Sequence, residues 1–202
     1  LVENHECIAV NSGTCALHMA FLAAGIGAGD EVIVPSFTFA ATANSVALTG
    51  ATPVFADIDP KTFCISPASI EANITPYTKA IMAVDIFGQS ADMDAIMAIA
   101  KRHRLKVISD TAQAPGALYK GKYAGTLADV GGFSLNYHKH IHTGEGGILV
   151  TNDDEIAKKV QEITDSQLQS IKLAKDNALI TKHVEQLTTK IGDKKTKLEK
   201  KS

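Results

Sequence analysis

Residues 80–113, AIMAVDIFGQSADMDAIMAIAKRHRLKVISDTAQ, decide the fold that we predict for this chain of 202 residues. An apolar run over 80–84 precedes an amphipathic stretch over 92–103, and a second β-rich run follows over 106–109. This order is typical of two parallel strands joined by a helix that packs on their sheet. The first run contains only apolar residues, as expected of a strand that is covered on both faces.

The same alternation continues on both sides of this unit. We predict strands at 7–10, 31–34, 52–56, 80–84, 106–109, 130–134 and 147–151. We predict helices at 14–24, 39–48, 67–73 and 92–103, with Ser66 and Asp92 as the N-caps of the last two. The predicted fold class is therefore α/β, with a mostly parallel central sheet and helices on both faces.

The composition favours a globular protein with one sizeable domain and an appendage. Apolar residues make up 45% of the chain, charged residues 21%, and the formal net charge is −2. No apolar run reaches the roughly 18 to 20 residues of a membrane span, and residues 1–6 lack the order of a signal peptide. We expect a cytoplasmic protein that binds neither membrane nor nucleic acid.

Neither the cysteines nor the histidines predict a metal site. The three cysteines are odd in number and lack CxxC spacing, so we expect buried, reduced thiols rather than a disulfide framework or a zinc ribbon. His138, His140 and His142 alternate, as ligands on an extended segment do. Lys139 interrupts them, and its positive charge would repel a divalent ion.

The composition changes near residues 152–165. Residues 1–154 carry nine basic and fifteen acidic side chains, whereas residues 155–202 carry eleven basic and seven acidic ones. Every proline and every aromatic residue lies in the first part. We predict a domain over 1–154 and a helical, lysine-rich tail over 155–202.

Within the tail, apolar residues follow a coiled-coil-like spacing. They are Ile180, Val184, Leu187, Ile191 and Leu198. The apolar phase breaks between 164 and 177, which predicts two lengths of helix with a turn near Asp165 and Ser166. The lysine-rich run 194–201 is expected to be a solvated helix end rather than a nucleic-acid patch, because acidic residues dilute it.

Polar residues follow several predicted strands, where open α/β sheets bind their ligands. Ser12, Gly13 and Thr14 follow a strand and open a helix, so they suit either a phosphate group or a simple helix cap. Asp110 ends a strand, where a carboxylate needs a cation, a hydrogen-bond donor or a helix to cap. Lys139 is the only lysine between Tyr123 and Ala157, although a salt bridge or a solvated loop would also explain it.

Four stretches, spread over about three quarters of the chain, carry a family resemblance. They are residues 11–59, 78–96, 109–122 and 133–153. In this order they closely resemble the DegT/DnrJ family of pyridoxal-phosphate-dependent sugar aminotransferases, which has the aspartate-aminotransferase-like fold. The resemblance implies a homodimeric enzyme of polysaccharide biosynthesis that uses pyridoxal 5'-phosphate. Its amino-acid donor, L-glutamate first, would supply an amino group to a nucleotide-linked keto sugar.

The resemblance also implies a role for three polar residues. Lys139 would bond to the cofactor aldehyde and then act as the base that moves a proton. Asp110 would pair with the pyridine nitrogen and keep it protonated. Gln113, one helical turn later, would lie near the phenolic oxygen of the ring.

Five further positions would hold the cofactor according to the same resemblance. Ser12, Gly13, Thr14 and Ser134 would bind the phosphate, and Phe39 would stack on the ring.

Amino transfer is favoured over the removal of a sugar hydroxyl by the position of one lysine. Family members that remove the hydroxyl carry histidine at the cofactor lysine position. Here Lys139 stands five residues after Ser134, and His140 stands one place beyond it. The segment 143–147, TGEGG, anchors this frame.

The chain departs from the family pattern at both ends. Family members normally begin some tens of residues before Cys7 and continue after Asp154 into a small domain that completes the neighbouring subunit's site. We therefore expect a chain that is truncated at both ends, with a complete cofactor site and an incomplete substrate pocket. The alternative is a catalytically incomplete fragment that retains the cofactor fold or acts as an assembly partner.

Overall fold

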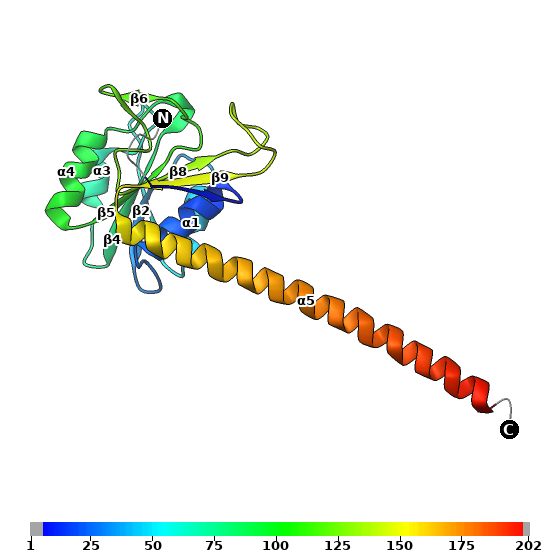
Figure 1. The fold of residues 1–202 in the computed structure, drawn as a ribbon. Coiled ribbons are helices and arrows are strands. Elements are labelled where there is room, and N and C mark those ends of the chain that lie inside the picture. The colour runs from blue at the N-terminus through cyan, green and yellow to red at the C-terminus, as the bar shows by residue number, and fades with distance from the viewer. Residues whose placement is uncertain (1–5, 200–202) are drawn as a thin grey trace. The chain divides into compact units, whose positions relative to one another are not determined.

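A computed structural model of the chain describes residues 6–199, except for some side chains between 167 and 199. The chain consists of two compact units, residues 1–161 and residues 162–202. The first unit is built on a seven-stranded sheet in the order β1-β9-β8-β5-β4-β2-β3 (Figure 1). The strands are β1 (Glu6–Val10), β2 (Glu31–Pro35), β3 (Thr52–Ala56), β4 (Thr78–Val84), β5 (Lys106–Asp110), β8 (Val130–Ser134) and β9 (Gly147–Thr151).

The strand directions place the carboxyl ends of six strands at one edge of the sheet. Strands β3, β2, β4, β5 and β8 pair in parallel, and β9 is antiparallel to both β8 and β1. Strand β9 is therefore the single strand of this sheet that runs in the opposite direction. The predicted α/β class and the mostly parallel sheet are confirmed.

Helices cover both faces of the sheet, as predicted. They are α1 (Gly13–Ala23), α2 (Ala41–Ala47), α3 (Pro67–Ala72) and α4 (Met93–His103). Helix α1 packs on β8, β9 and β5, whereas α4 packs on β4 and β5 from the other face (Figure 1). The apolar run 80–84 lies in the core between them, and all of its side chains are buried. This burial explains why that run contains no polar residue.

The predicted helix caps at Ser66 and Asp92 are confirmed. The Ser66 side chain accepts a hydrogen bond from the Ser69 N–H, and the Asp92 side chain accepts one from the Ala95 N–H. Both contacts satisfy backbone donors that the helix itself leaves unpaired.

Two short elements were not predicted. Strands β6 (Leu118–Tyr119) and β7 (Lys122–Tyr123) form a hairpin, and a 3-10 turn, η1, spans Ile86–Gly88. The hairpin turn needs positive φ at both central residues, which Lys120 adopts at 48° and Gly121 at 83°. Strands of two residues are too short to show an alternating pattern, so periodicity gave no signal for them.

The prediction of a turn near Asp165 and Ser166 is wrong, because α5 is one continuous helix over Asp154–Glu199. The segment contains no proline and a single glycine, Gly192, so no residue near 165 removes a backbone hydrogen bond. A change in apolar phase rotates the apolar face of a helix without ending it. The side chains of the predicted seam (180, 184, 187, 191 and 198) and residues 200–201 of the lysine run lie outside the described part.

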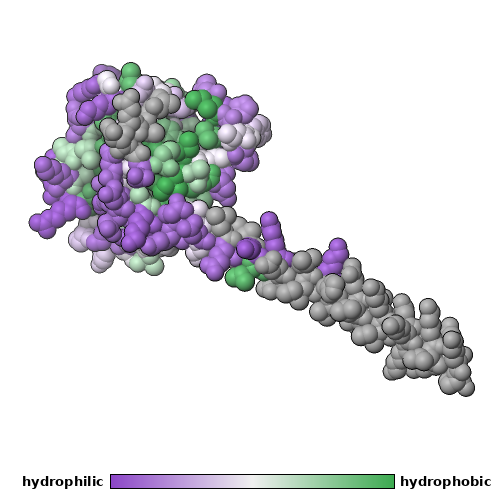
Figure 2. All heavy atoms as spheres, in the orientation of Figure 1, coloured by the Kyte–Doolittle hydropathy of each residue, from purple (hydrophilic) through white to green (hydrophobic). Residues whose placement is uncertain are grey.

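The three cysteines are free thiols, but only one of them is buried. Cys64 is buried, Cys15 is partly exposed, and Cys7 is exposed. Cys7 lies on β1, an edge strand of the sheet, and this position explains why the expected burial is wrong there. None of the helices in the described residues is long and apolar enough to cross a membrane. Figure 2 shows hydrophilic and hydrophobic side chains interspersed on one face of residues 6–161.

Strand β8 depends on a glycine at position 131. A Cβ atom there would lie 1.9 Å from the Gly125 carbonyl oxygen, which belongs to the backbone and cannot rotate away. We therefore expect Gly131→Ala to lower the free energy of unfolding by about 3 kcal/mol. Urea unfolding followed by circular dichroism measures this change.

Gly27→Ala is the matched control. Its added Cβ would lie 3.7 Å from the Thr49 carbonyl oxygen, an ordinary contact. The free energy of unfolding should change by less than about 1 kcal/mol. Equal effects of the two substitutions would contradict the importance of the close approach at Gly131.

Candidate active site

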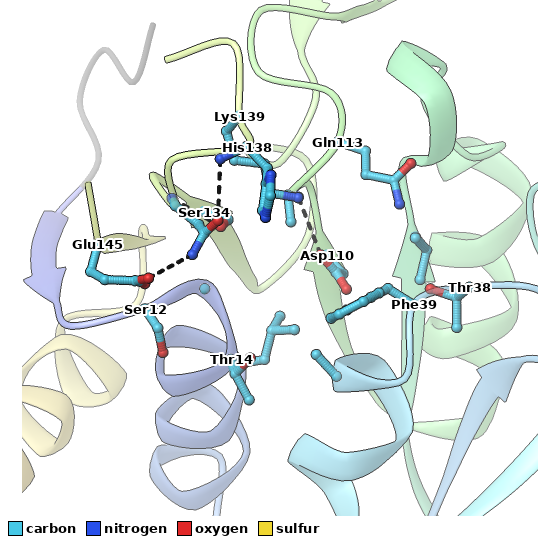
Figure 3. A pocket seen from close by; sticks show the side chains of 16 residues that line it. Ser12, Thr14, Thr38, Phe39, Asp110, Gln113, Ser134, His138, Lys139 and Glu145 are labelled. Carbon is cyan, nitrogen blue, oxygen red and sulfur yellow. Dashed lines mark hydrogen bonds between the residues drawn. The ribbon is translucent and has the colours of Figure 1, made fainter. Parts of the chain in front are cut away.

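A cavity of about 440 Å³ lies at the carboxyl ends of the strands, and all eight predicted site residues line it. They are Ser12, Gly13, Thr14, Phe39, Asp110, Gln113, Ser134 and Lys139. Figure 3 shows the start of α1 on one side, Thr38 and Phe39 on the other, and Asp110 between them. Segments from four parts of the chain meet here because β1, β2, β5 and β8 run in the same direction.

The first turn of α1 approaches β8 very closely. The Ser12 Oγ accepts a hydrogen bond from the Cys15 N–H at 3.1 Å and so caps the helix. The next residue must be glycine, because a Cβ at position 13 would lie 2.8 Å from the Ser134 Cβ. The backbone N–H groups of this turn have no partner within the helix, and the positive end of the helix dipole lies there. The turn is chemically suited to an anion.

Asp110 is the buried acidic group of the cavity, with 6% of its surface exposed. Its Oδ2 accepts a hydrogen bond from the Thr42 hydroxyl at 3.0 Å, and its Oδ1 accepts one from the Ala112 N–H at 3.2 Å. Burial raises the pKa of this carboxyl, and the nearby Asp85 charge raises it further, against the effect of these hydrogen bonds and of Lys139. A turn rather than a helix follows Asp110, so the helix-cap explanation is wrong.

Lys139 lies on a loop that is organised around Asn136. The Asn136 carbonyl oxygen accepts a hydrogen bond from the Lys139 N–H at 2.8 Å. The Asn136 side chain accepts one from the His138 N–H at 3.2 Å and donates one to Glu145 at 2.8 Å (Figure 3). His138 and Lys139 line the cavity, whereas His140 is not among its lining residues. Lys139 thus reaches the cavity, together with its neighbour His138.

Gln113 and Phe39 complete the predicted set. Gln113 lies in a turn rather than on a helix, and its Oε1 accepts a hydrogen bond from the Phe87 N–H at 3.2 Å. Phe39 lines the cavity with 71% of its surface exposed, so one of its faces is free to cover a ligand.

Eight further lining residues were given no role toward the cofactor from the sequence. They are Leu17, Thr38, Ala41, Val84, Ala112, Asn136, His138 and Glu145. Thr38, Asn136 and His138 belong to segments that follow predicted strands, which is a usable signal. Glu145 gave no such signal, because it does not directly follow a strand and a hydrogen bond joins it to Asn136, nine positions earlier in the chain.

The residues present fit a ligand with a positively charged ring nitrogen at one end and a phosphate at the other. Across the part of the chain that the structure describes, no basic side chain forms an ion pair with Asp110. A buried carboxylate that has only neutral partners is stabilised by a cation placed against it. Gly13 and Ser134 both line the cavity, beside the helix N–H groups that have no partner within the helix, and such groups suit a small anion.

Comparison with known proteins identifies the family of the chain. The model of the DegT/DnrJ/EryC1/StrS aminotransferase family matches residues 1–191. The chain belongs to this family. GDP-perosamine synthase of Caulobacter vibrioides is 56% identical over 156 residues, which are 77% of this chain and 42% of that protein. The L-glutamine:2-deoxy-scyllo-inosose aminotransferase of Streptomyces lividus is 45% identical over 78% of this chain and 37% of its own length.

Solved structures of the family share the fold. An aminotransferase from Psychrobacter cryohalolentis has a TM-score of 0.76 and 47% identity, over 77% of this chain and 40% of that one. NtdA from Bacillus subtilis, solved with bound cofactor PMP, has a TM-score of 0.71 and 44% identity, over 76% of this chain and 35% of that one. The chain spans about two fifths of the length of the curated relatives that it matches.

The buried carboxyl of Asp110 makes stability depend on pH. Because its pKa in the folded chain is raised above the usual 3.8, the folded state binds more protons than the unfolded state above that pH. The contribution of Asp110 to the free energy of unfolding therefore falls as pH rises from 3.8 through the raised pKa. Asp110→Asn should flatten the pH dependence and stabilise the cofactor-free chain at neutral pH.

Urea unfolding at a series of pH values measures this difference. The control is Asp57→Asn, which changes an exposed carboxylate. The free energy of unfolding of this variant should depend on pH in the same way as that of the wild type. A steeper loss of stability with rising pH in Asp110→Asn than in the wild type would contradict the prediction.

Proposed function

We propose that residues 1–154 form the cofactor domain of a pyridoxal-phosphate-dependent aminotransferase. The amino group of an amino acid, L-glutamate first, would pass to a nucleotide-linked keto sugar. The observation that carries this proposal is the meeting of three groups in one cavity. Asp110 supplies a buried carboxylate, Lys139 supplies an amine, and the first turn of α1 supplies backbone N–H groups.

Asp110 would hold the pyridine nitrogen of the cofactor and keep it protonated. Its burial supports this role, since a carboxylate in a low dielectric interacts strongly with a cation. Thr42 and Ala112 each donate to a different oxygen of the carboxylate, and they keep it from rotating. The group is thus oriented before the cofactor arrives.

The opposite end of the cavity would bind the cofactor phosphate. Ser12, Gly13, Thr14 and Ser134 line it, and the helix dipole of α1 favours a negative charge there. The Ser12 hydroxyl accepts a hydrogen bond from the Cys15 N–H and donates a long one, at 3.5 Å, to Asn11 Oδ1. A phosphate oxygen would replace Asn11 as the acceptor of that proton.

Lys139 would hold the cofactor aldehyde and then take and return a proton at its Nζ. When bound, the cofactor withdraws electrons from the donor's Cα, which makes the proton on that carbon acidic. The hydrogen bonds of Asn136 hold the backbone of the Lys139 loop, so the amine has a fixed point of attachment. Phe39 would stack on the ring, and Gln113 would lie near its phenolic oxygen.

The substrate class and the oligomeric state rest on the relatives and on the cavity rim. One relative bears the name GDP-perosamine synthase, which supports a sugar linked to a nucleotide, and another is named for L-glutamine as its donor. Phe39 lines the cavity and is exposed in the single chain. A second copy of the chain would cover this aromatic side chain. We therefore propose a homodimer and test both amino donors.

The covalent role of Lys139 predicts a visible absorbance band. The purified chain with pyridoxal 5'-phosphate should absorb at about 410–430 nm. Borohydride should abolish this band and fix the cofactor covalently to Lys139. Lys139→Ala should lose the band, and Lys122→Ala, which changes an exposed lysine outside the cavity, should keep it. Absorbance and peptide mass spectrometry measure both effects. A band that survives dialysis in Lys139→Ala would rule out this role.

Amino transfer predicts that the donor changes the same band in a single turnover. L-glutamate or L-glutamine should convert the bound cofactor to its aminated form, with loss of absorbance at about 410–430 nm. Stopped-flow mixing measures the rate, with D-glutamate as the control. If neither donor changes the band while Lys139 carries the cofactor, the chain is a cofactor-binding fragment rather than a complete aminotransferase.

The proposed dimer predicts a mass near twice the 21.4 kDa of one chain. Sedimentation equilibrium with bound cofactor measures this mass. A monomer at all concentrations tested would contradict the dimer and leave the cofactor site unaffected.

A further inference from the structure

A second buried carboxylate, Asp85, lies beside Asp110 and has no part in the roles described above. Asp85 directly follows β4 and is 0% exposed. In the β4–β5 ladder Val84 pairs with Asp110, and the Asp85 N–H donates to the Asp110 carbonyl oxygen at 2.9 Å. Asp85 is not among the residues that line the cavity, so it can act on a ligand only through its neighbours.

The carboxylate of Asp85 ties down the residues on either side of Asp110. Its Oδ2 accepts hydrogen bonds from the Ser109 hydroxyl at 2.9 Å and from the Thr111 hydroxyl at 2.7 Å. Its Oδ1 accepts a hydrogen bond from the Ala91 N–H at 3.0 Å. The strand end that presents Asp110 is therefore held from both sides by one side chain.

Within residues 6–199, no basic side chain forms an ion pair with Asp85. Its hydrogen-bond donors are the hydroxyls of Ser109 and Thr111, the Ala91 N–H and the Ser90 side chain, all of them neutral. Burial raises its pKa against the effect of these donors. A carboxylate accepts from all of these donors at once, whereas an asparagine would keep the same contacts only if both hydroxyls turned from donors to acceptors.

A negative charge behind Asp110 has a specific electrostatic effect on the cavity. Two buried carboxylates repel each other, and a cation placed against Asp110 relieves that repulsion. The same field gives a neutral group in that position no comparable stabilisation. A protonated ring nitrogen is such a cation.

We propose, on the basis of the proposed function, that Asp85 is a positioning residue for the cofactor ring. It holds Asp110 in place through Ser109 and Thr111, and its negative charge favours the protonated ring nitrogen over the neutral one. Asp85 thereby acts on the cofactor without touching it, as a buried partner of the group that does.

Asp85→Asn in the full chain tests the charge. The amide oxygen can accept from the Ala91 N–H. The amide nitrogen can donate to the hydroxyls of Ser109 and Thr111 once these turn from donors to acceptors, so the contacts can be kept while the charge is removed. The probe is pyridoxal 5'-phosphate labelled with ¹⁵N in the ring. We expect the ¹⁵N resonance to move toward that of a neutral pyridine and the dissociation constant to rise about tenfold.

Asp129→Asn is the matched control. Asp129 precedes β8 and accepts a hydrogen bond from the Val107 N–H at 2.7 Å, near the opposite end of β5 from Asp110. The same substitution there should leave the ¹⁵N resonance and the dissociation constant at their wild-type values. An effect on unfolding alone, equal in both variants, would indicate a purely structural role for Asp85.

A second pair of variants tests the role of Asp85 if Asp85→Asn fails to fold. Thr111→Val removes one hydroxyl that binds Asp85, and Thr111→Ser retains it. We expect Thr111→Val to weaken cofactor binding several-fold and to shift the ¹⁵N resonance, and Thr111→Ser to do neither.

The outcomes separate the two proposals. A wild-type chain that gives no bound ¹⁵N signal overturns the proposed function and the role of Asp85 with it. A wild-type chain that binds the labelled cofactor, beside Asp85→Asn or Thr111→Val variants with unchanged resonance and affinity, overturns the role of Asp85 alone.

Discussion

The burial of the Asp110 carboxylate is the constraint on which the rest of the site depends. A charged group at the end of a core strand is costly unless its surroundings hold it. Thr42 comes from α2, Ala112 from the turn after β5, and Asp85 from the end of β4, so three elements must meet for this group to be tolerated. The parallel arrangement of β4 and β5 brings them together.

Close approach of backbones shapes the other end of the cavity. Gly13 allows the first turn of α1 to reach Ser134, and Gly147 allows β9 to pass beside the carbonyl oxygen of Ser12. Gly131, on β8, allows the Gly125 carbonyl oxygen to lie where a side chain would otherwise be. These contacts set the distance between the helix terminus and Asp110. A site for a rigid, flat ligand needs that distance to be fixed.

Local patterns in the sequence predicted the main elements, because the strongest signals coincide with burial. The run 80–84 reads as a strand covered on both faces, and the caps at Ser66 and Asp92 mark helix starts that the structure retains. The short hairpin at Lys120 was missed because its strands hold two residues each. The turn near Asp165 was wrong because a shift in apolar phase does not break a helix.

The sequence by itself determined the α/β class, the family and the eight residues that line one side or another of the cavity. The class follows from strand and helix periodicity, whereas the family and the eight residues follow from the resemblance of four stretches of the chain to the DegT/DnrJ family. Only the tertiary structure decided how those residues are held. The contacts of Asp110 with Thr42, of Asp85 with Thr111, and of Asn136 with Glu145 join positions separated by 9 to 68 residues. Local patterns carry no information on such pairs, since they form only when the sheet aligns its strands.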